Sequence, residues 1–190
     1  MPGTVIQTNL NLGYAGKVSR NPQSKINSRA VKSILNGSNV ETQPNIPFGA
    51  AVVTNTDNTY SLFGATGTGV SSATVANFGG IAVSEVKQSM TYGYGTNANA
   101  GQYEPNTPCD VLQQGTATVY CTEGTPTANG LVYIVTVAGD TSPVGSFVAT
   151  ATPVGTGATA VQLTNARWTT GKMDSSTKIA EITLLTQLNA

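Results

Sequence analysis

A chain of 190 residues fits one domain, or one domain with a long arm, and can bury a hydrophobic core. Charged residues make up 9% of the sequence, against roughly 25% in an ordinary soluble domain, and the formal net charge is zero. Histidine is absent, which excludes Ser-His-Asp and Cys-His catalysis together with the commonest metal ligand.

The composition also indicates the fold class. Thr occurs 29 times and Val 19 times, against 10 Leu, and β-branched residues favour strands. The 21 Gly and 9 Pro separate short apolar runs, a pattern typical of an all-β protein. No run approaches the roughly 18 consecutive apolar residues of a membrane helix. The first ten residues lack the basic start of a secretory signal, so we expect synthesis without export.

Residues 1–45 are polar and rich in Asn, with repeated Gly and Pro and little alternation of apolar and polar residues. This texture predicts an extended N-terminal arm, followed by a β domain over residues 46–190. Within the arm, Ser28 is a candidate N-cap for a short helix over Arg29 to Leu35. Asn36 and Gly37 would end that helix.

The arm is basic. Residues 1–40 contain five basic and no acidic residues, whereas residues 41–190 contain four basic and nine acidic ones. Three interpretations remain open: a solvated, partly disordered tail, an arm that docks onto an acidic surface, or a nucleic-acid-binding segment. The third is the weakest, because the stretch has one aromatic residue available for stacking on bases. The candidate contact residues of the arm are Tyr14, Lys17, Arg20, Lys25, Arg29 and Lys32.

From Ile46 the sequence changes to short apolar runs separated by turn residues, and nine such runs predict a sandwich or a barrel-like domain. The runs are IPFGAAVVT, TYSLF, FGGIAVSEV, CDVLQ, ATVYC, LVYIVTV, SFVATA, TAVQL and KIAEITLLTQL. The last run alternates as a strand does. Its apolar positions are Ala180, Ile182, Leu184 and Leu188, and its polar positions are Glu181, Thr183 and Gln187.

Two loops stand out between these runs. The stretch TYGYGTNANAGQYEPNTP predicts a long loop with a contact surface formed by Tyr92, Tyr94 and Tyr103. The run GATGTG, residues 64–69, is similar to a phosphate-binding loop but lacks the Lys and the following helix. We therefore interpret it as a flexible loop.

Catalytic chemistry finds little support in the remaining residues. Cys109 and Cys121 could face each other across a hairpin in CDVLQQGTATVYC, but without export we expect buried thiols. Two cysteines alone do not make a zinc site. No pair of carboxylates is marked out for glycosidase-type acid and base roles. We predict no catalytic, metal-binding or cofactor-binding residues and no cofactor.

The order of motifs resembles one known family. GYAG (13–16) precedes the basic arm, and then come PFGAAVV (47–53), FGGIAV (78–83), PCDVLQQGTATVYC (108–121), LVYIV (131–135), NARW (165–168) and IAEITLL (179–185). Together they are similar to the capsid cement, or head decoration, proteins of tailed bacteriophages. The likeness covers nearly the whole chain and rests on the order and spacing of the motifs.

That resemblance implies a non-enzymatic, oligomeric β protein on the outer capsid surface, assembled in the host bacterial cytoplasm. Its implied partners are the major capsid protein and other copies of the chain, as a dimer or trimer, with no nucleic acid and no membrane. The arm would then lie across neighbouring subunits, and several linked arms would bind with avidity. The alternative is a surface β domain that binds a receptor or a carbohydrate through the Tyr-rich loop.

Overall fold

The computed structural model describes residues 13–19, 24–84 and 101–186, and within them the fold is almost entirely β. The all-β prediction is confirmed. The strands are β1 (Lys25–Ala30), β2 (Ile46–Pro47), β3 (Ala51–Thr54), β4 (Tyr60–Leu62), β5 (Phe78–Ala82), β6 (Gln102–Tyr103), β7 (Pro108–Tyr120), β8 (Leu131–Val137), β9 (Phe147–Val148), β10 (Thr159–Met173) and β11 (Ile179–Leu184). One 3-10 turn, η1 (Val75–Asn77), precedes β5.

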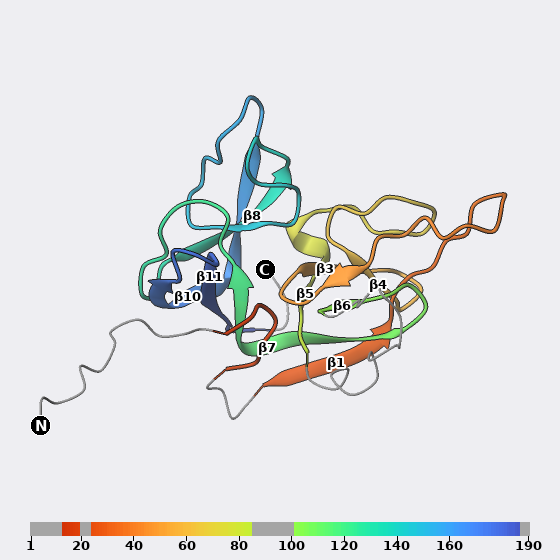
Figure 1. The fold of residues 1–190 in the computed structure, drawn as a ribbon, viewed down its shortest axis with the longest axis horizontal. Coiled ribbons are helices and arrows are strands. Elements are labelled where there is room, and N and C mark those ends of the chain that lie inside the picture. Colours follow the sequence, from red (N-terminus) through yellow and green to blue (C-terminus); the bar gives the residue numbers. More distant parts are fainter. Residues whose placement is uncertain (1–12, 20–23, 85–100, 187–190) are drawn as a thin grey trace, which may run out of the picture.

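Strand β7 connects the two halves of the main sheet. In the main sheet the strand order is β4-β3-β5-β7-β11-β10-β8-β9, and β1 also pairs with β7. The first half of β7 pairs with β1 and β5, and its second half, from Gly115 to Tyr120, pairs antiparallel with β11. Figure 1 shows the result as two lobes that meet along β7.

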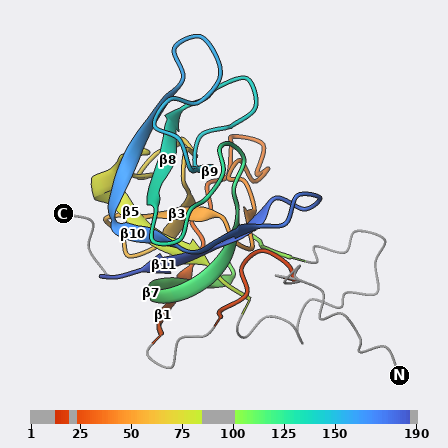
Figure 2. The ribbon, with the colours of Figure 1, turned by 90° about the vertical axis from the view of Figure 1, so that its left-hand side faces the viewer.

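Each lobe is curled until its ends meet. In the C-terminal lobe, a parallel bridge joins Cys121, just after β7, to Phe147 in β9. In the other lobe, a parallel bridge joins Val31, just after β1, to Tyr60 in β4. In Figure 2, β7 and β11 lie side by side and β1 lies below them. The barrel-like expectation therefore describes both halves of the sheet.

The sequence prediction of two strands, CDVLQ and ATVYC, is wrong in one respect, because they form a single strand of 13 residues. Gly115 lies where the pairing changes from β1 to β11, with a φ of 123° that other residues rarely adopt. It bends the strand instead of ending it, as glycine does at the corner of a sheet. Cys109 and Cys121 lie at opposite ends of β7 as buried thiols that do not pair in a disulfide, which confirms the expectation of buried thiols.

The expected helix over residues 29–35 is also wrong. Residues 25–30 form β1, whose Ser28 pairs with Asp110 and whose Arg29 pairs with Cys109. The local capping signal does not produce a helix here because β7 pairs with the backbone of residues 25–30, and the Val31 and Lys32 amides donate to the Thr107 and Tyr60 carbonyls. The boundary expected at residue 45 stays a prediction.

Two hydrophobic clusters hold the sheet together. The larger lies between the lobes and includes Ile81, Leu112, Leu163, Trp168 and Ile182, each at most 1% exposed. The smaller lies in the N-terminal lobe, around Ile46, Tyr60 and Tyr103. The alternation predicted for the last strand is confirmed at its inward positions, since Ala180, Ile182 and Leu184 are at most 1% exposed. Leu188 and Gln187 lie outside the described residues.

The described residues contain no helix with the length and apolar character needed to cross a bilayer.

Candidate functional site

The segment 13–19 lies along the second half of β7, on the edge opposite β11. The Gly16 amide donates to the Thr118 carbonyl at 2.7 Å, the Ser19 amide donates to the Thr116 carbonyl at 2.8 Å, and Val18 bridges to Ala117. The segment thus completes the edge of β7 that β1 begins, because both run antiparallel to it. It leaves Tyr14 46% exposed and Lys17 exposed at the surface.

The glycine of the GYAG motif is needed for this docking. Gly16 has a φ of 82° and is buried, and a Cβ on it would lie 2.6 Å from Cβ of Phe48 and 2.7 Å from the amide nitrogen of Gly49. A contact that short is not tolerated between real side chains, so only glycine lets the segment approach the turn after β2. The motif therefore anchors the start of the described chain to the domain.

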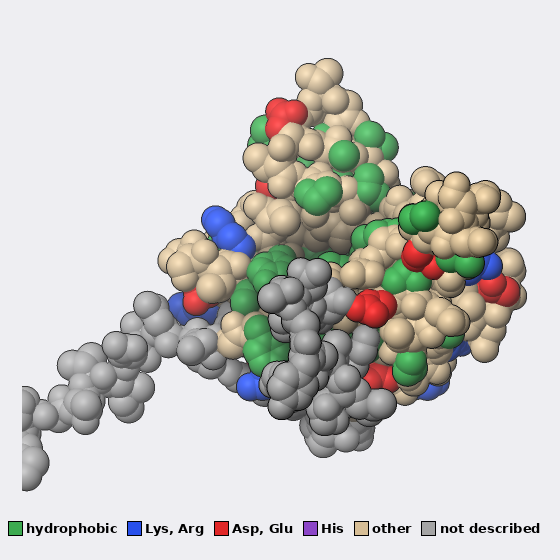
Figure 3. Space-filling model, turned by 45° about the vertical axis from the view of Figure 1, so that its right-hand side comes forward, with side chains coloured by type: hydrophobic (Ala, Val, Ile, Leu, Met, Phe, Trp, Pro, Cys, Tyr) green, Lys and Arg blue, Asp and Glu red, His purple; other side chains and the backbone are tan. Residues whose placement is uncertain are grey.

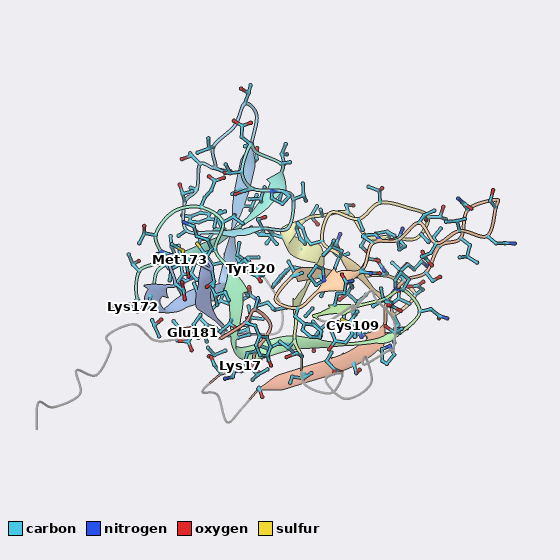
Figure 4. The ribbon with its side chains drawn as sticks, viewed as in Figure 1. Lys17, Cys109, Tyr120, Lys172, Met173 and Glu181 are labelled. Atoms are coloured by element: carbon cyan, nitrogen blue, oxygen red, sulfur yellow. The ribbon has the colours of Figure 1, made fainter. Side chains whose placement is uncertain are left out.

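The segment also covers a buried carboxylate. Glu181 projects from the polar face of β11, is 3% exposed, and accepts a hydrogen bond of 2.9 Å from the Ser19 hydroxyl. Figure 4 labels Lys17 and Glu181 near each other, beside β7 and β11. Beside them, the Thr118 hydroxyl donates to the Tyr14 carbonyl at 2.6 Å. The polar face of the last strand is therefore an internal contact with the N-terminal segment.

The predicted basic residues do not form one continuous patch. Lys25 is exposed at the start of β1, whereas the Arg29 guanidinium lies 5.1 Å from the centroid of the Tyr60 ring. Lys32 forms an ion pair with Asp57, and this contact lowers the pKa of the Asp57 carboxyl to about 2. Arg20 lies outside the described residues. Arg29 and Lys32 therefore each have a partner within the chain.

The Tyr-rich loop contributes less surface than the sequence predicts. Tyr103 is fully buried in β6, where its hydroxyl donates to the Val83 carbonyl at 2.5 Å. Its ring packs edge-on against Phe48, with centroids 5.1 Å apart. Burial also raises the pKa of the Tyr103 phenol, which keeps it a donor. The prediction that Tyr103 belongs to an exposed contact surface is therefore wrong. Tyr92 and Tyr94 lie outside the described residues.

A protruding hairpin, residues 33–42, was missed by the sequence reasoning. Leu35 bridges to Glu41 across it, and Leu35 and Val40 are each 57% exposed. The signal was present in the turn sequence Asn36-Gly37-Ser38-Asn39 between two apolar residues, which is typical of a hairpin. Asn39 has a φ of 57°, a conformation that Asn tolerates better than most residues.

Glu41 fastens the base of the hairpin. Its carboxylate accepts hydrogen bonds from the Ser33 hydroxyl at 2.5 Å and from the amides of Ile34 at 3.0 Å and Gln43 at 2.8 Å. These donors favour the charged form and lower the pKa of Glu41 from 4.5 to about 2, with the Ser33 bond as the largest cause. One side chain thus ties together both strands of the hairpin.

Acidification is expected to loosen this hairpin. Because the pKa of Glu41 is lower in the folded protein than the reference value of 4.5, its contribution is fully present above about pH 4.5 and is lost as the pH falls toward about 2. A carbon-detected NMR titration should give a midpoint for Glu41 well below 4.5, with the Ile34 and Gln43 amides shifting in parallel. In Glu41→Gln these two amides should show no such titration. A Glu41 midpoint at 4.5 would contradict the network.

The described surface in Figure 3 carries few charged side chains. Most of what this face presents is tan or green, that is, backbone, uncharged polar side chains and hydrophobic side chains. Within residues 13–19, 24–84 and 101–186, no three His, Cys, Asp or Glu side chains lie close enough together to hold a metal ion. The arrangement defines a class: an all-β protein built on a curled sheet, with exposed polar loops.

The comparisons with known proteins make the class specific. The sequence model of the family described as "Structural cement protein (E217 gp24/Pam3 gp6)" matches residues 1–185. The chain belongs to this family of phage structural cement proteins. Its role is therefore that of a capsid cement or decoration protein, located on the virion capsid and binding capsid subunits.

A solved structure supports the fold. The chain is similar to a chain from "The capsid of Myoviridae Phage XM1", with a TM-score of 0.59 and 15% sequence identity, over 97% of this chain and 96% of that chain. At this identity the likeness shows the fold alone. The sequence matches no curated protein.

Proposed function

We propose that the chain binds the outer surface of a tailed-bacteriophage head, where it reinforces contacts between subunits of the major capsid protein and catalyses no reaction. The observation that carries this proposal is the family match over residues 1–185. In the proposed role the protein works as a dimer or trimer, without a cofactor, and is assembled onto heads in the host cytoplasm. Multivalent attachment suits such a protein, since weak single contacts become avid when copies are linked.

The proposed contact residues of the arm are Tyr14, Lys17, Arg20, Lys25, Arg29 and Lys32. Among the described ones, Tyr14, Lys17 and Lys25 are exposed and lie on the segment that follows the outer edge of β7. Arg29 and Lys32 would have to share or exchange their present partners, Tyr60 and Asp57, to bind a capsid. Lys17 and Lys25 are the more exposed of the described arm cations, since Arg29 and Lys32 are only partly exposed, and this exposure makes them the ones that an acidic surface can reach.

Two measurements test the proposal directly. Cement-free heads of the phage that encodes the chain should retain the purified protein in co-sedimentation, and bound heads should resist heat or chelators better than bare ones. Light scattering of the free protein should give the mass of a dimer or trimer. A protein that stays monomeric and sediments alone at all concentrations up to micromolar would contradict the proposal.

Removing the two exposed cations should weaken this binding in a salt-dependent way. In Lys17→Gln/Lys25→Gln, each lost pair is expected to reduce affinity for heads by about 1.4- to 5-fold at low salt. The difference from the parent should shrink at high salt, because screening weakens exposed pairs. The thermal midpoint should stay the same, since neither side chain is buried. Equal affinity at every salt concentration would assign attachment to uncharged surfaces.

The control is Lys172→Gln/Lys178→Gln, which removes the same charge from exposed positions in β10 and directly before β11. It should bind as the parent does. Equal losses in both double variants would show a general effect of net charge rather than a contact through the N-terminal segment.

A further inference from the structure

The hairpin 33–42 presents two apolar side chains at the periphery of the molecule. Leu35 and Val40 are each 57% exposed, and they flank the turn as neighbours, because the Asn36 amide donates to the Val40 carbonyl at 2.9 Å. In Figure 1 the hairpin is the pair of orange ribbons that reaches the right-hand end of the fold, away from the β8 lobe. Exposed apolar side chains that adjoin each other at a tip indicate a contact site more than scattered ones do.

The tip is held in one conformation. The Asn36 side-chain oxygen accepts from the amides of Ser38 at 2.9 Å and Val40 at 3.0 Å, and the Asn39 amide donates to the Asn36 carbonyl at 2.9 Å. Glu41 fixes the base through the bonds described above. A binding element that is ordered before it meets its partner loses little conformational entropy on binding.

The glycine-rich loop 64–69 supports the hairpin from behind. The Gln43 side-chain amide donates to the Thr66 carbonyl at 2.9 Å, and Gln43 is 7% exposed. A Cβ on Gly67 would lie 2.7 Å from Cδ1 of Ile34, so the absence of a side chain there lets the hairpin rest on the loop. The GATGTG loop, residues 64–69, which is similar to a phosphate-binding loop, therefore packs against the base of the hairpin.

The chemistry of the tip indicates apolar recognition. The turn Asn36-Gly37-Ser38-Asn39 has no charged residue. At the base, Glu41 is satisfied by four donors, and Lys32 is neutralised by Asp57. Well-packed apolar anchors surrounded by neutral polar groups are typical of the centre of a protein interface.

We propose that this hairpin inserts Leu35 and Val40 into an apolar groove on a major capsid subunit. The inference rests on the proposed function. A second copy of the chain fits the hairpin less well as an occupant, because a stable pair of proteins needs about 20–30 residues on each side and the hairpin offers only residues 33–42. A small anchor is sufficient on a capsid, where linked copies share many sites on one lattice.

The first experiment compares two double variants for binding to cement-free heads. Leu35→Ser/Val40→Ser removes both anchors, and Leu185→Ser/Val154→Ser removes a Leu and a Val that are 49% and 60% exposed elsewhere. We expect the hairpin variant to bind at least tenfold more weakly and the control variant to bind as the parent does. Both should keep the thermal midpoint of the parent, because all four side chains are largely exposed.

Unchanged binding of the hairpin variant, with the parent bound normally, would overturn this inference and leave the proposed function intact. Failure of the parent itself to bind heads would instead overturn the proposed function. A hairpin variant that binds weakly only because its oligomer has dissociated, as light scattering would reveal, would assign the hairpin to contacts between copies and overturn the inference as well.

The second experiment identifies the neighbour of the tip. Both native cysteines are 0% exposed, so Ser38→Cys provides a thiol that a maleimide photo-crosslinker can label selectively on the folded protein. After binding to heads and illumination, mass spectrometry should find the crosslink on the major capsid protein. A crosslink found only between copies of the chain would contradict the proposal.

Discussion

Replacing Trp168 by alanine is expected to lower the free energy of unfolding by about 3–5 kcal/mol, the range for deleting a large aromatic side chain from a core. Trp168 is 1% exposed and belongs to the larger hydrophobic cluster, between the two lobes. It lies in β10 directly opposite Ile182 of β11. Urea denaturation followed by circular dichroism measures the loss. A loss below about 1 kcal/mol would show that the ring does not fill the core.

Trp168→Phe is the matched control. The indole Nε1 is buried without a hydrogen-bond partner among the described residues, and an unsatisfied buried donor is costly. Phenylalanine removes that N–H group and keeps most of the apolar ring, so the variant should lose less than half of what the alanine variant loses. Equal losses for the two variants would show that the indole nitrogen makes a contact essential for stability.

Gly80→Ala is expected to destabilise the fold by about 2–6 kcal/mol, the sum of backbone strain and overpacking. Gly80 in β5 has a φ of 134°, where a side chain is strained by about 1–3 kcal/mol. A Cβ there would also lie 2.2 Å from the Leu112 carbonyl oxygen and 2.7 Å from Cγ1 of Val111. Both contacts are with residues of β7, so β5 would have to move away from β7. Overpacking of this kind costs about 1–3 kcal/mol.

Gly37→Ala serves as its control, since a Cβ at that turn position meets nothing within 4 Å. We expect its unfolding free energy to stay within about 0.5 kcal/mol of the parent. Thermal and urea unfolding of the two variants, side by side, measure the difference. Similar stability of Gly80→Ala and the parent would show that β5 does not approach β7 as closely as described.

The local sequence was sufficient to predict most strands of the domain. The stretch LVYIVTV is β8, and the alternation in the last run correctly predicts that Ile182 and Leu184 are buried, although Glu181 on the other face is buried as well. Such patterns are readable because side chains on a strand alternate between its two faces. The order of short motifs likewise predicted the cement family, although each motif alone is common.

The sites were less predictable, because burial depends on residues distant in sequence. Tyr103 sits in a Gly-, Asn- and Pro-rich stretch typical of a surface loop, yet it is buried by pairing with β2 and by Phe48. The residues proposed as a basic arm include Arg29 and Lys32, whose partners Tyr60 and Asp57 belong to the domain. A single sequence does not reveal such pairings, since no local pattern encodes them.

By itself, then, the sequence determined the all-β class, the position of most strands and the family, because these depend on residue propensity, alternation and motif order. Only the tertiary structure shows that β7 continues through Gly115, because the residues around this glycine are equally compatible with a turn that would end the strand. It also decided that Glu181 is covered by Ser19 and that Leu35 and Val40 remain outside the core. Each of these outcomes depends on which segments, distant in sequence, pack against one another. No local sequence pattern specifies that packing, so it is known only from the folded chain.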